Sequence, residues 1–272
     1  LRSRGLGDVY KRQMVSGMGT IAGSVMGTYI GMLGGTDPAA KVLFATHLLS
    51  ASVMAVPGSI VLAKMLCPQT EEATDHVAIS GKEKENSNIL DAISSGTVTG
   101  VKLMTNIAAM LLVFISLVAL ANYITEGVIG RYTGLNDWIV KITDGKAQGL
   151  TFQFILGVIT SPFMWLIGVP SQDIMLVGSL LGQKTILNEF VAYFQLQQWK
   201  DAGLFMYEKS ILMSTYILCG FANISSIGIL LGGLGVLAPE KRGLISRIGL
   251  PAMIGGALVS VLSATIIGMI LG

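Results

Sequence analysis

Long uncharged stretches alternate with short polar connections along most of the chain. A membrane core about 30 Å thick is crossed by about 20 residues of α-helix. Uninterrupted stretches of that length run over residues 42–63, 103–125 and 250–272. This pattern predicts an all-α integral membrane protein that crosses the bilayer several times.

Two further uncharged stretches, residues 14–34 and 210–239, carry small polar residues at their centres, among them Asn223. In lipid a backbone group without a partner costs several kcal/mol, so an interrupted helix is stable only where it lines a wet cavity enclosed by protein. The pattern therefore predicts two unwound membrane helices. Interruptions at matching places in two halves of a chain indicate a transporter site. Small residues also serve close helix packing, but the amide of Asn223 favours a site.

Residues 151–194 comprise two half-length apolar segments joined by Gly168 and Pro170. Neither segment is suited to a simple crossing, which predicts a re-entrant helical hairpin that returns to the side from which it entered. Glu189 lies in the second arm. Because a carboxylate at the centre of a bilayer costs at least about 2.5 kcal/mol, we expect Glu189 to face a polar cavity. The alternative is an ordinary glutamate at the protein surface.

The remaining segments are polar connections. Residues 64–101 form a solvated connector, and residues 91–102 at its end predict an amphipathic helix on the membrane surface. Residues 126–149 are expected to be a polar loop. Lysine and arginine in the short loop 240–247 favour the cytoplasmic side.

The first 13 residues are unlike the rest of the chain. They have the composition of neither a signal peptide nor a membrane span, and they resemble a translated library adaptor. We expect this leader to be foreign, extended and without packing against the rest. The natural sequence would then start near Met14, inside a membrane segment, which leads us to expect that residues 14–272 are the C-terminal portion of a longer protein.

Composition supports a membrane protein and argues against several other classes. Charged residues make up 12% of the chain and hydrophobic residues 52%, whereas soluble proteins carry about 25% charged residues. A net charge of +2 without a basic block does not favour nucleic-acid binding. Cys67 and Cys219 form no metal or disulfide pattern. His47 is either a proton relay or a hydrogen-bonded structural imidazole.

Several motifs together resemble the concentrative nucleoside transporters, in matching order and spacing from Met14 to Gly272. They are Thr20–Val25 (Thr-Ile-Ala-Gly-Ser-Val), His47–Met54, Pro68–Glu71, Asn188–Tyr193 (Asn-Glu-Phe-Val-Ala-Tyr), Gly220–Asn223 (Gly-Phe-Ala-Asn) and Gly232–Leu234.

This resemblance implies a homotrimeric, multi-pass symporter that imports nucleosides across the cytoplasmic membrane, with a scaffold and a moving transport domain in each protomer. It implies no cofactor besides the coupling ion. By residue-to-residue match the nucleoside site would include Glu189, Asn223, Ser226, Phe221 and Val25. The matched part of the sodium site would be Thr20, Ile21 and Ser24. The family's first three spans and its first hairpin, with a Gly-Gln-Thr-Glu motif, have no counterpart in this sequence.

The chemistry of these residues agrees with the resemblance. A carboxylate can accept hydrogen bonds from two neighbouring sugar hydroxyls, while Asn223 and Ser226 can donate and accept. The hydroxyls of Thr20 and Ser24 favour sodium over a proton, because hard cations take oxygen ligands. No enzyme constellation is visible in the sequence. The alternatives are a proton-coupled permease, a gate-type protein of the same superfamily with another solute or a structural role, and a membrane enzyme with Glu189 as general base.

Overall fold

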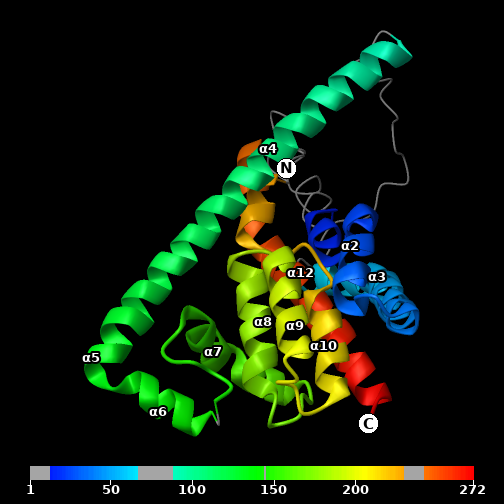
Figure 1. Ribbon diagram of the computed structural model, residues 1–272. Helices are drawn as coiled ribbons and strands as arrows, with labels where there is room; N and C mark the ends of the chain where they lie inside the picture. The colour runs from blue at the N-terminus through cyan, green and yellow to red at the C-terminus, as the bar shows by residue number, and fades with distance from the viewer. Residues whose placement is uncertain (1–12, 67–87, 144, 230–241) are drawn as a thin grey trace.

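The computed structural model describes residues 13–66, 88–143, 145–229 and 242–272, and all regular structure in these ranges is helical (Figure 1). The prediction for the leader falls almost wholly on residues 1–12, outside this part. Most of the 64–101 connector and the last third of the 210–239 stretch also lie outside it.

The N-terminal part of the described chain is an interrupted helix followed by a long continuous one. Residues 13–19 are helical, the helix stops at Thr20, and it resumes as α2 (Gly23–Gly34). A tight turn leads into α3 (Pro38–Leu66), whose first turn is capped by Asp37 Oδ1, which accepts the Ala39 N–H at 2.9 Å. The predicted 42–63 segment lies within α3, which runs past its internal Pro57.

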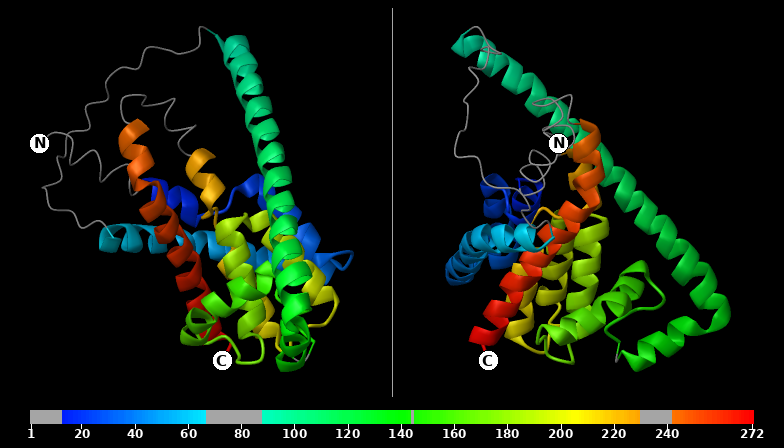
Figure 2. Two further views of the ribbon diagram at one scale, coloured as in Figure 1. Left: turned by 90° about the vertical axis from the view of Figure 1, so that its left-hand side faces the viewer. Right: turned by 180° about the vertical axis from the view of Figure 1, so that it is seen from behind.

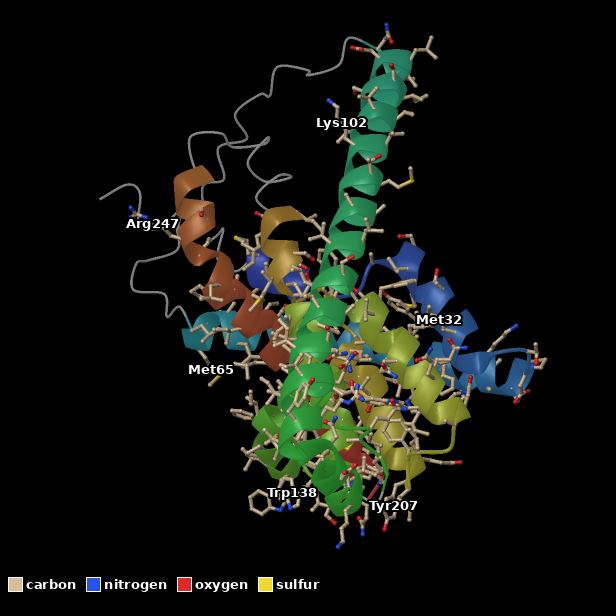
Figure 3. The ribbon with its side chains drawn as sticks, turned by 60° about the vertical axis from the view of Figure 1, so that its left-hand side comes forward. Met32, Met65, Lys102, Trp138, Tyr207 and Arg247 are labelled. Carbon is tan, nitrogen blue, oxygen red and sulfur yellow. The ribbon has the colours of Figure 1, made fainter. Side chains whose placement is uncertain are left out.

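A single helix of 34 residues, α4 (Ile89–Asn122), replaces the predicted surface helix at 91–102 and span at 103–125. At 1.5 Å per residue it is about 51 Å long. Asn88 caps its start by accepting the Asp91 N–H. The sequence of α4 contains no proline, so helical hydrogen bonding propagates along it without interruption. In Figure 3, Lys102 on α4 lies clear of the other described helices.

The predicted polar loop at 126–149 is mostly helical. A π-helical segment η1 (Tyr123–Gly130) continues α4, and α5 (Arg131–Thr133) and α6 (Leu135–Ile142) follow. Gly134, with φ of 72°, makes the turn between α5 and α6. The Asn136 side chain stabilises this corner, because its Nδ2 donates to Glu126 O and its Oδ1 accepts the Leu150 N–H. Local hydrogen bonds to one asparagine therefore order a segment whose composition indicated a loop.

Three shorter helices occupy the region of the predicted hairpin: α7 (Phe152–Leu166), α8 (Ile174–Ile186) and α9 (Glu189–Asp201). The helices α7 and α8 pack closely side by side, because the glycines at their contact have no side chains. A Cβ added to Gly157 would lie only 2.8 Å from Met175 O. The predicted second arm is two helices instead of one. The break between them lies at Asn188, whose side chain accepts the Val191 N–H and thereby caps the start of α9.

The C-terminal part contains a second interrupted helix. α10 (Glu208–Leu218) ends before residues 219–223, and residues 224–229 are again helical. The final helix, α12 (Arg242–Ile270), packs against both α3 and α10, and the views of Figure 2 show it crossing α3. By length and composition, Pro38–Leu66 and Ser246–Ile270 are the two described helices that could cross a membrane.

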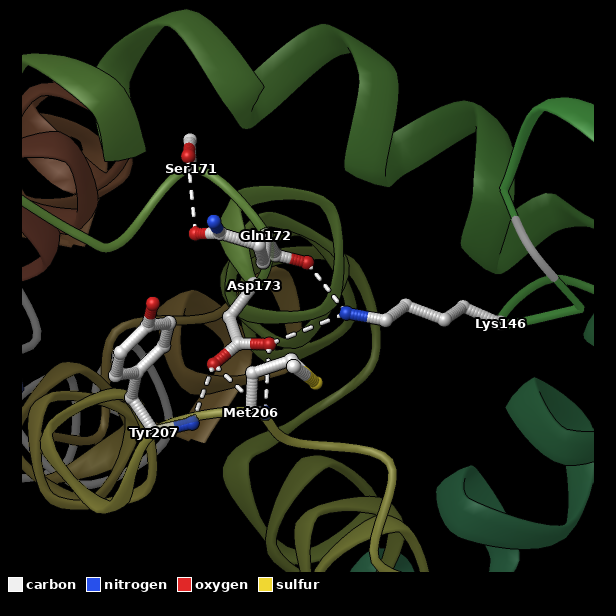
Figure 4. A network of polar contacts seen from close by, with 6 residues as sticks. All are labelled: Lys146, Ser171, Gln172, Asp173, Met206 and Tyr207. Atoms are coloured by element: carbon white, nitrogen blue, oxygen red, sulfur yellow. Dashed lines mark hydrogen bonds and ion pairs between the residues drawn. The ribbon is translucent and has the colours of Figure 1, made fainter.

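The turn between α7 and α8 is fixed by a buried carboxylate (Figure 4). Asp173 is fully buried, and its two oxygens accept the backbone N–H groups of Met206 and Tyr207 at 3.0–3.2 Å. Lys146 donates to the same carboxylate at 3.3 Å and to Gln172 O at 2.6 Å. Asp173 thus joins three segments that are distant in sequence: the loop before α7, the α7–α8 turn and the start of α10.

Replacing Asp173 by alanine is expected to lower the free energy of unfolding by about 3 kcal/mol, because two backbone donors and an ammonium group lose their acceptor. Denaturant titration of the purified protein in detergent measures this loss. Asp201→Ala is the matched control. The carboxylate of Asp201 is exposed and forms an ion pair with Lys200 at 3.4 Å, and such a surface pair contributes at most about 1 kcal/mol. Equal losses in the two variants would contradict the structural role of Asp173.

Candidate functional site

A contact between Glu189 and Asn223 is the centre of the candidate site. Glu189 is the first residue of α9, Asn223 lies in the interruption after α10, and the two are 34 positions apart. Asn223 Nδ2 donates to Glu189 Oε2 at 2.9 Å, and the two residues are 0% and 8% exposed. A buried carboxylate is therefore held by a neutral amide from another helix.

The orientation of Asn223 is fixed by the helical residues that follow it. Its Oδ1 accepts the Ser226 N–H at 2.8 Å and the Ser225 hydroxyl at 2.6 Å. This is an N-cap arrangement, which directs the amide oxygen towards the new helix. The amide nitrogen is left to point at Glu189. Asn223 thus begins one helix and contacts the start of another.

Ser226 adds an unused polar group beside this pair. Its side chain is fully buried, and its hydroxyl has no hydrogen-bond partner within the described part of the chain. Buried polar atoms are nearly always hydrogen-bonded, so an unpartnered one calls for an explanation such as a ligand. The structure brings together Glu189, Asn223 and Ser226.

The other candidate residues lie at the two interruptions. Thr20 Oγ1 donates to Ser16 O at 3.1 Å, which leaves its oxygen lone pairs free to accept or coordinate. Ser24 is exposed in the first turn of α2. Ile21 and Val25 are half-buried against the main apolar core, and Phe221 is half-buried in the second interruption.

The two interruptions meet at Gly220. Its φ is 153°, and a Cβ there would lie 2.5 Å from Ser260 Oγ, 3.1 Å from Gly19 O and 3.3 Å from Met18 O. The end of helix 13–19 and the end of α10 therefore converge beside α12. No pattern in the sequence predicts this contact, because it joins residues about 200 positions apart.

Lys184 is a buried residue to which sequence reasoning assigned no role. It is 0% exposed, and its ammonium group donates to Ile217 O at 2.7 Å and to Ser260 Oγ at 2.9 Å. Ser260 in turn donates to Cys219 O at 2.9 Å. A charged residue within an apolar segment is a signal that could have identified it.

Aromatic side chains support the same region. Tyr29 of α2 stacks on Tyr193 of α9, with ring centroids 4.1 Å apart, and Tyr193 donates its hydroxyl to Thr215 O at 2.8 Å. His47 Nδ1 lies 3.2 Å from the Tyr216 hydroxyl. This contact supplies the partner that a structural imidazole needs, while the proton-relay role of His47 stays a prediction.

A cavity of about 570 Å³ lies elsewhere, between the loop before α7 and the helices α8 and α9. Its polar wall includes Gln153, Ser179 and Gln198, and neither Glu189 nor Asn223 lines it. The candidate site is therefore defined by its hydrogen bonds and by the unpartnered Ser226 hydroxyl, and not by this cavity.

Gly220→Ala is expected to destabilise the protein by at least about 2 kcal/mol, because it combines an unfavourable backbone conformation with a clash against Ser260. Gly203→Ala is the control, since Gly203 also has a positive φ, 67°, but open space around it. Denaturant titration of both variants separates the clash from the strain. A loss no larger than that of Gly203→Ala would mean that the convergence at Gly220 tolerates a side chain.

Comparison with known proteins relates this architecture to a transport family. Residues 47–268 match the family model described as "Na+ dependent nucleoside transporter C-terminus". The chain is 36% identical over 261 residues to nucleoside permease NupC of Helicobacter pylori, covering 95% of this chain and 57% of that protein. It is 38% identical over 271 residues to sodium/nucleoside cotransporter 1 of Rattus norvegicus, covering 94% and 38% respectively.

A solved structure agrees with these relatives. The chain resembles the structure of CNTnw in an inward-facing substrate-bound state with a TM-score of 0.75 and 33% sequence identity. The match covers 98% of this chain and 58% of that one. The chain thus spans less than two thirds of the length of each of these proteins.

Proposed function

The chain belongs to the concentrative nucleoside transporter family, and we propose on that premise that it provides the C-terminal portion of a sodium-coupled nucleoside importer. The observation that carries the proposal is the buried contact between Glu189 and Asn223 beside the unpartnered Ser226 hydroxyl. In a transporter these groups serve to bind a solute and not to transform it. The rat and Helicobacter pylori relatives, named for sodium/nucleoside cotransport and nucleoside permeation, support this reading.

Glu189, Asn223 and Ser226 would hold the ribose. The carboxylate of Glu189 can accept hydrogen bonds from two neighbouring hydroxyls of the sugar. Asn223 has a second Nδ2 hydrogen besides the one it donates to Glu189, and Ser226 can donate or accept. Phe221, half-buried beside Asn223, would border the nucleoside, and Val25 would contact the base.

The first interruption would contribute part of a sodium site. Thr20 and Ser24 offer hydroxyl oxygens on either side of the break, and Ile21 offers a backbone carbonyl between them. Carbonyls and half-helix C-terminal ends coordinate sodium in transporters with interrupted helices. Further ligands would come from the part of the full-length protein that corresponds to the uncovered region of the relatives.

The proposed arrangement in the membrane follows from the same elements. The apolar helices α7 and α8, with α9, would form the re-entrant hairpin, and the two interrupted helices would be the unwound membrane helices. The long helix α4, with exposed apolar residues such as Met104 and Leu112, would belong to a scaffold. A homotrimer in the cytoplasmic membrane, crossed several times by each protomer, completes the proposal.

The ion site is tested by Thr20→Ala combined with Ser24→Ala in the full-length transporter. Loss of two oxygen ligands is expected to raise the sodium concentration for half-maximal uridine uptake roughly tenfold, which corresponds to about 1.4 kcal/mol, with a smaller effect on uridine affinity at saturating sodium. Thr28→Ala, in an exposed position of α2, is the control. Unchanged sodium dependence in the double variant would exclude this ion site and favour proton coupling.

The ribose contact is tested by Glu189→Gln, which preserves size and removes the negative charge. Hydrogen bonds to a charged acceptor are worth about 1.5–3 kcal/mol, so the affinity for uridine is expected to fall by roughly 10- to 150-fold. Equilibrium binding to the purified full-length transporter measures this. Glu208→Gln, at the exposed start of α10, is the matched control and should leave affinity unchanged.

A second ligand distinguishes sugar recognition from a structural role. A 2′,3′-dideoxynucleoside lacks the hydroxyls that Glu189 would bind, so it should bind the unaltered protein weakly and lose little more with Glu189→Gln. If the substitution weakened both nucleosides by the same factor, Glu189 would act on the fold and the ribose assignment would be wrong.

A further inference from the structure

The C-terminal ends of two helices meet inside the protein. Helix 13–19 ends with the carbonyls of Met18 and Gly19 beside Gly220, and α10 ends two residues before the same glycine. The C-terminal end of a helix carries a partial negative charge of about half an electron, owing to its unpaired carbonyl groups. Two such ends that converge away from water repel each other unless a positive charge lies near them.

Lys184 supplies a positive charge at this point. Its ammonium group is fully buried and binds the Ile217 carbonyl at the end of α10. It also binds Ser260 Oγ, which itself contacts the Cys219 carbonyl and would touch a Cβ on Gly220. In the described ranges no carboxylate lies within ion-pair distance of Lys184. One backbone oxygen and one hydroxyl oxygen therefore contact this charge, and oxygen atoms of these kinds also bind metal cations at the ends of interrupted helices.

The segment that carries Lys184 also carries Glu189, five residues later in the sequence. Lys184 binds the C-terminal end of α10, and Glu189 binds Asn223, which begins helix 224–229. A cation therefore faces the negative end of one half-helix and an anion faces the positive end of the next. Both charges match the dipoles on the two sides of the interruption.

We propose that Lys184 is a built-in cation at the convergence of the two interrupted helices, and a positioning residue that holds α8 and α9 against the second interruption. Its ammonium group fills the oxygen-lined position that a free monovalent cation would otherwise occupy at the end of α10. This role of Lys184 does not depend on the identity of the transported solute.

Cys219 provides a probe next to the proposed contact. Its thiol is 2% exposed and lies 4.0 Å from Leu48 O and Ser52 Oγ, so a thiol reagent should label it slowly. In the full-length transporter with Cys67→Ser and any other cysteines replaced, Lys184→Ala and Lys184→Met are expected to raise the labelling rate of Cys219 at least about tenfold, since each removes two charge-assisted hydrogen bonds.

Lys200→Ala is the matched control for these variants. Lys200 also donates to a backbone carbonyl, Leu33 O at 2.6 Å, but at the end of α2 instead of at the interruption. Its replacement should leave the labelling of Cys219 unchanged. If Lys200→Ala exposed Cys219 as much as Lys184→Ala does, the effect would be general loosening and the proposal would be wrong.

Cation dependence separates a built-in cation from simple packing. Lys184→Ala leaves space bordered by Ile217 O and Ser260 Oγ, so ammonium chloride should slow the labelling of Cys219 in this variant relative to N-methylglucamine chloride. Lys184→Met fills the space with an apolar chain and should show no such protection. Faster labelling that is insensitive to ammonium in both variants would overturn the proposal, as would unchanged labelling.

A milder substitution covers the case in which the Lys184 variants do not fold. Ser260→Ala keeps the buried charge but removes one of its two acceptors, and it should raise the labelling rate of Cys219 by about threefold, as expected for one neutral hydrogen bond. No change in this variant would contradict the proposal. The labelling needs no nucleoside, so failure of uridine uptake would argue against the proposed function alone.

Discussion

The interruption of α10 inside the protein sets the constraint on which the surrounding structure depends. A helix that ends away from water leaves carbonyl groups that need donors. At the end of α10 the Thr215 carbonyl accepts the Cys219 N–H, and three other elements supply further donors. Tyr193 of α9 donates to Thr215, Lys184 of α8 to Ile217, and Ser260 of α12 to Cys219. The position of α10 relative to its neighbours is therefore specified by hydrogen bonds as well as by apolar contact.

The same requirement connects the candidate site to the fold. Asn223 begins the helix after the interruption with its oxygen and contacts Glu189 with its nitrogen, so the geometry of the carboxylate depends on how the broken helix resumes. Because Lys184 lies near the end of α8 and Glu189 begins α9, a displacement of these two helices would disturb both sides of the interruption together. In a transporter this coupling would favour movement of α8, α9 and the interrupted helix as one body.

Several features of this protein could be predicted from the sequence. The uncharged stretches predict apolar helices, because their length and lack of charge suit no other structure, and two of them are found as α3 and α12. The small polar residues near Thr20 and Asn223 lie where helical structure stops, while the unwinding of these helices within a membrane stays a prediction. The motifs around Glu189 and Asn223 correctly indicated the family, because a run of specific residues is readable without knowing where it lies in space.

Other features were decided only by the tertiary structure. Composition suggested a surface helix, a span and a loop in a region where α4, η1 and α6 are almost continuously helical. The polarity of a segment does not show where its helix ends. The start of α9 at Glu189 depends on the N-cap of Asn188, a local signal that the apolar pattern obscured. The role of Lys184 could not be predicted, because its acceptors lie 33 and 76 residues away. A buried charge is explained by the oxygens around it, and folding alone brings those oxygens together.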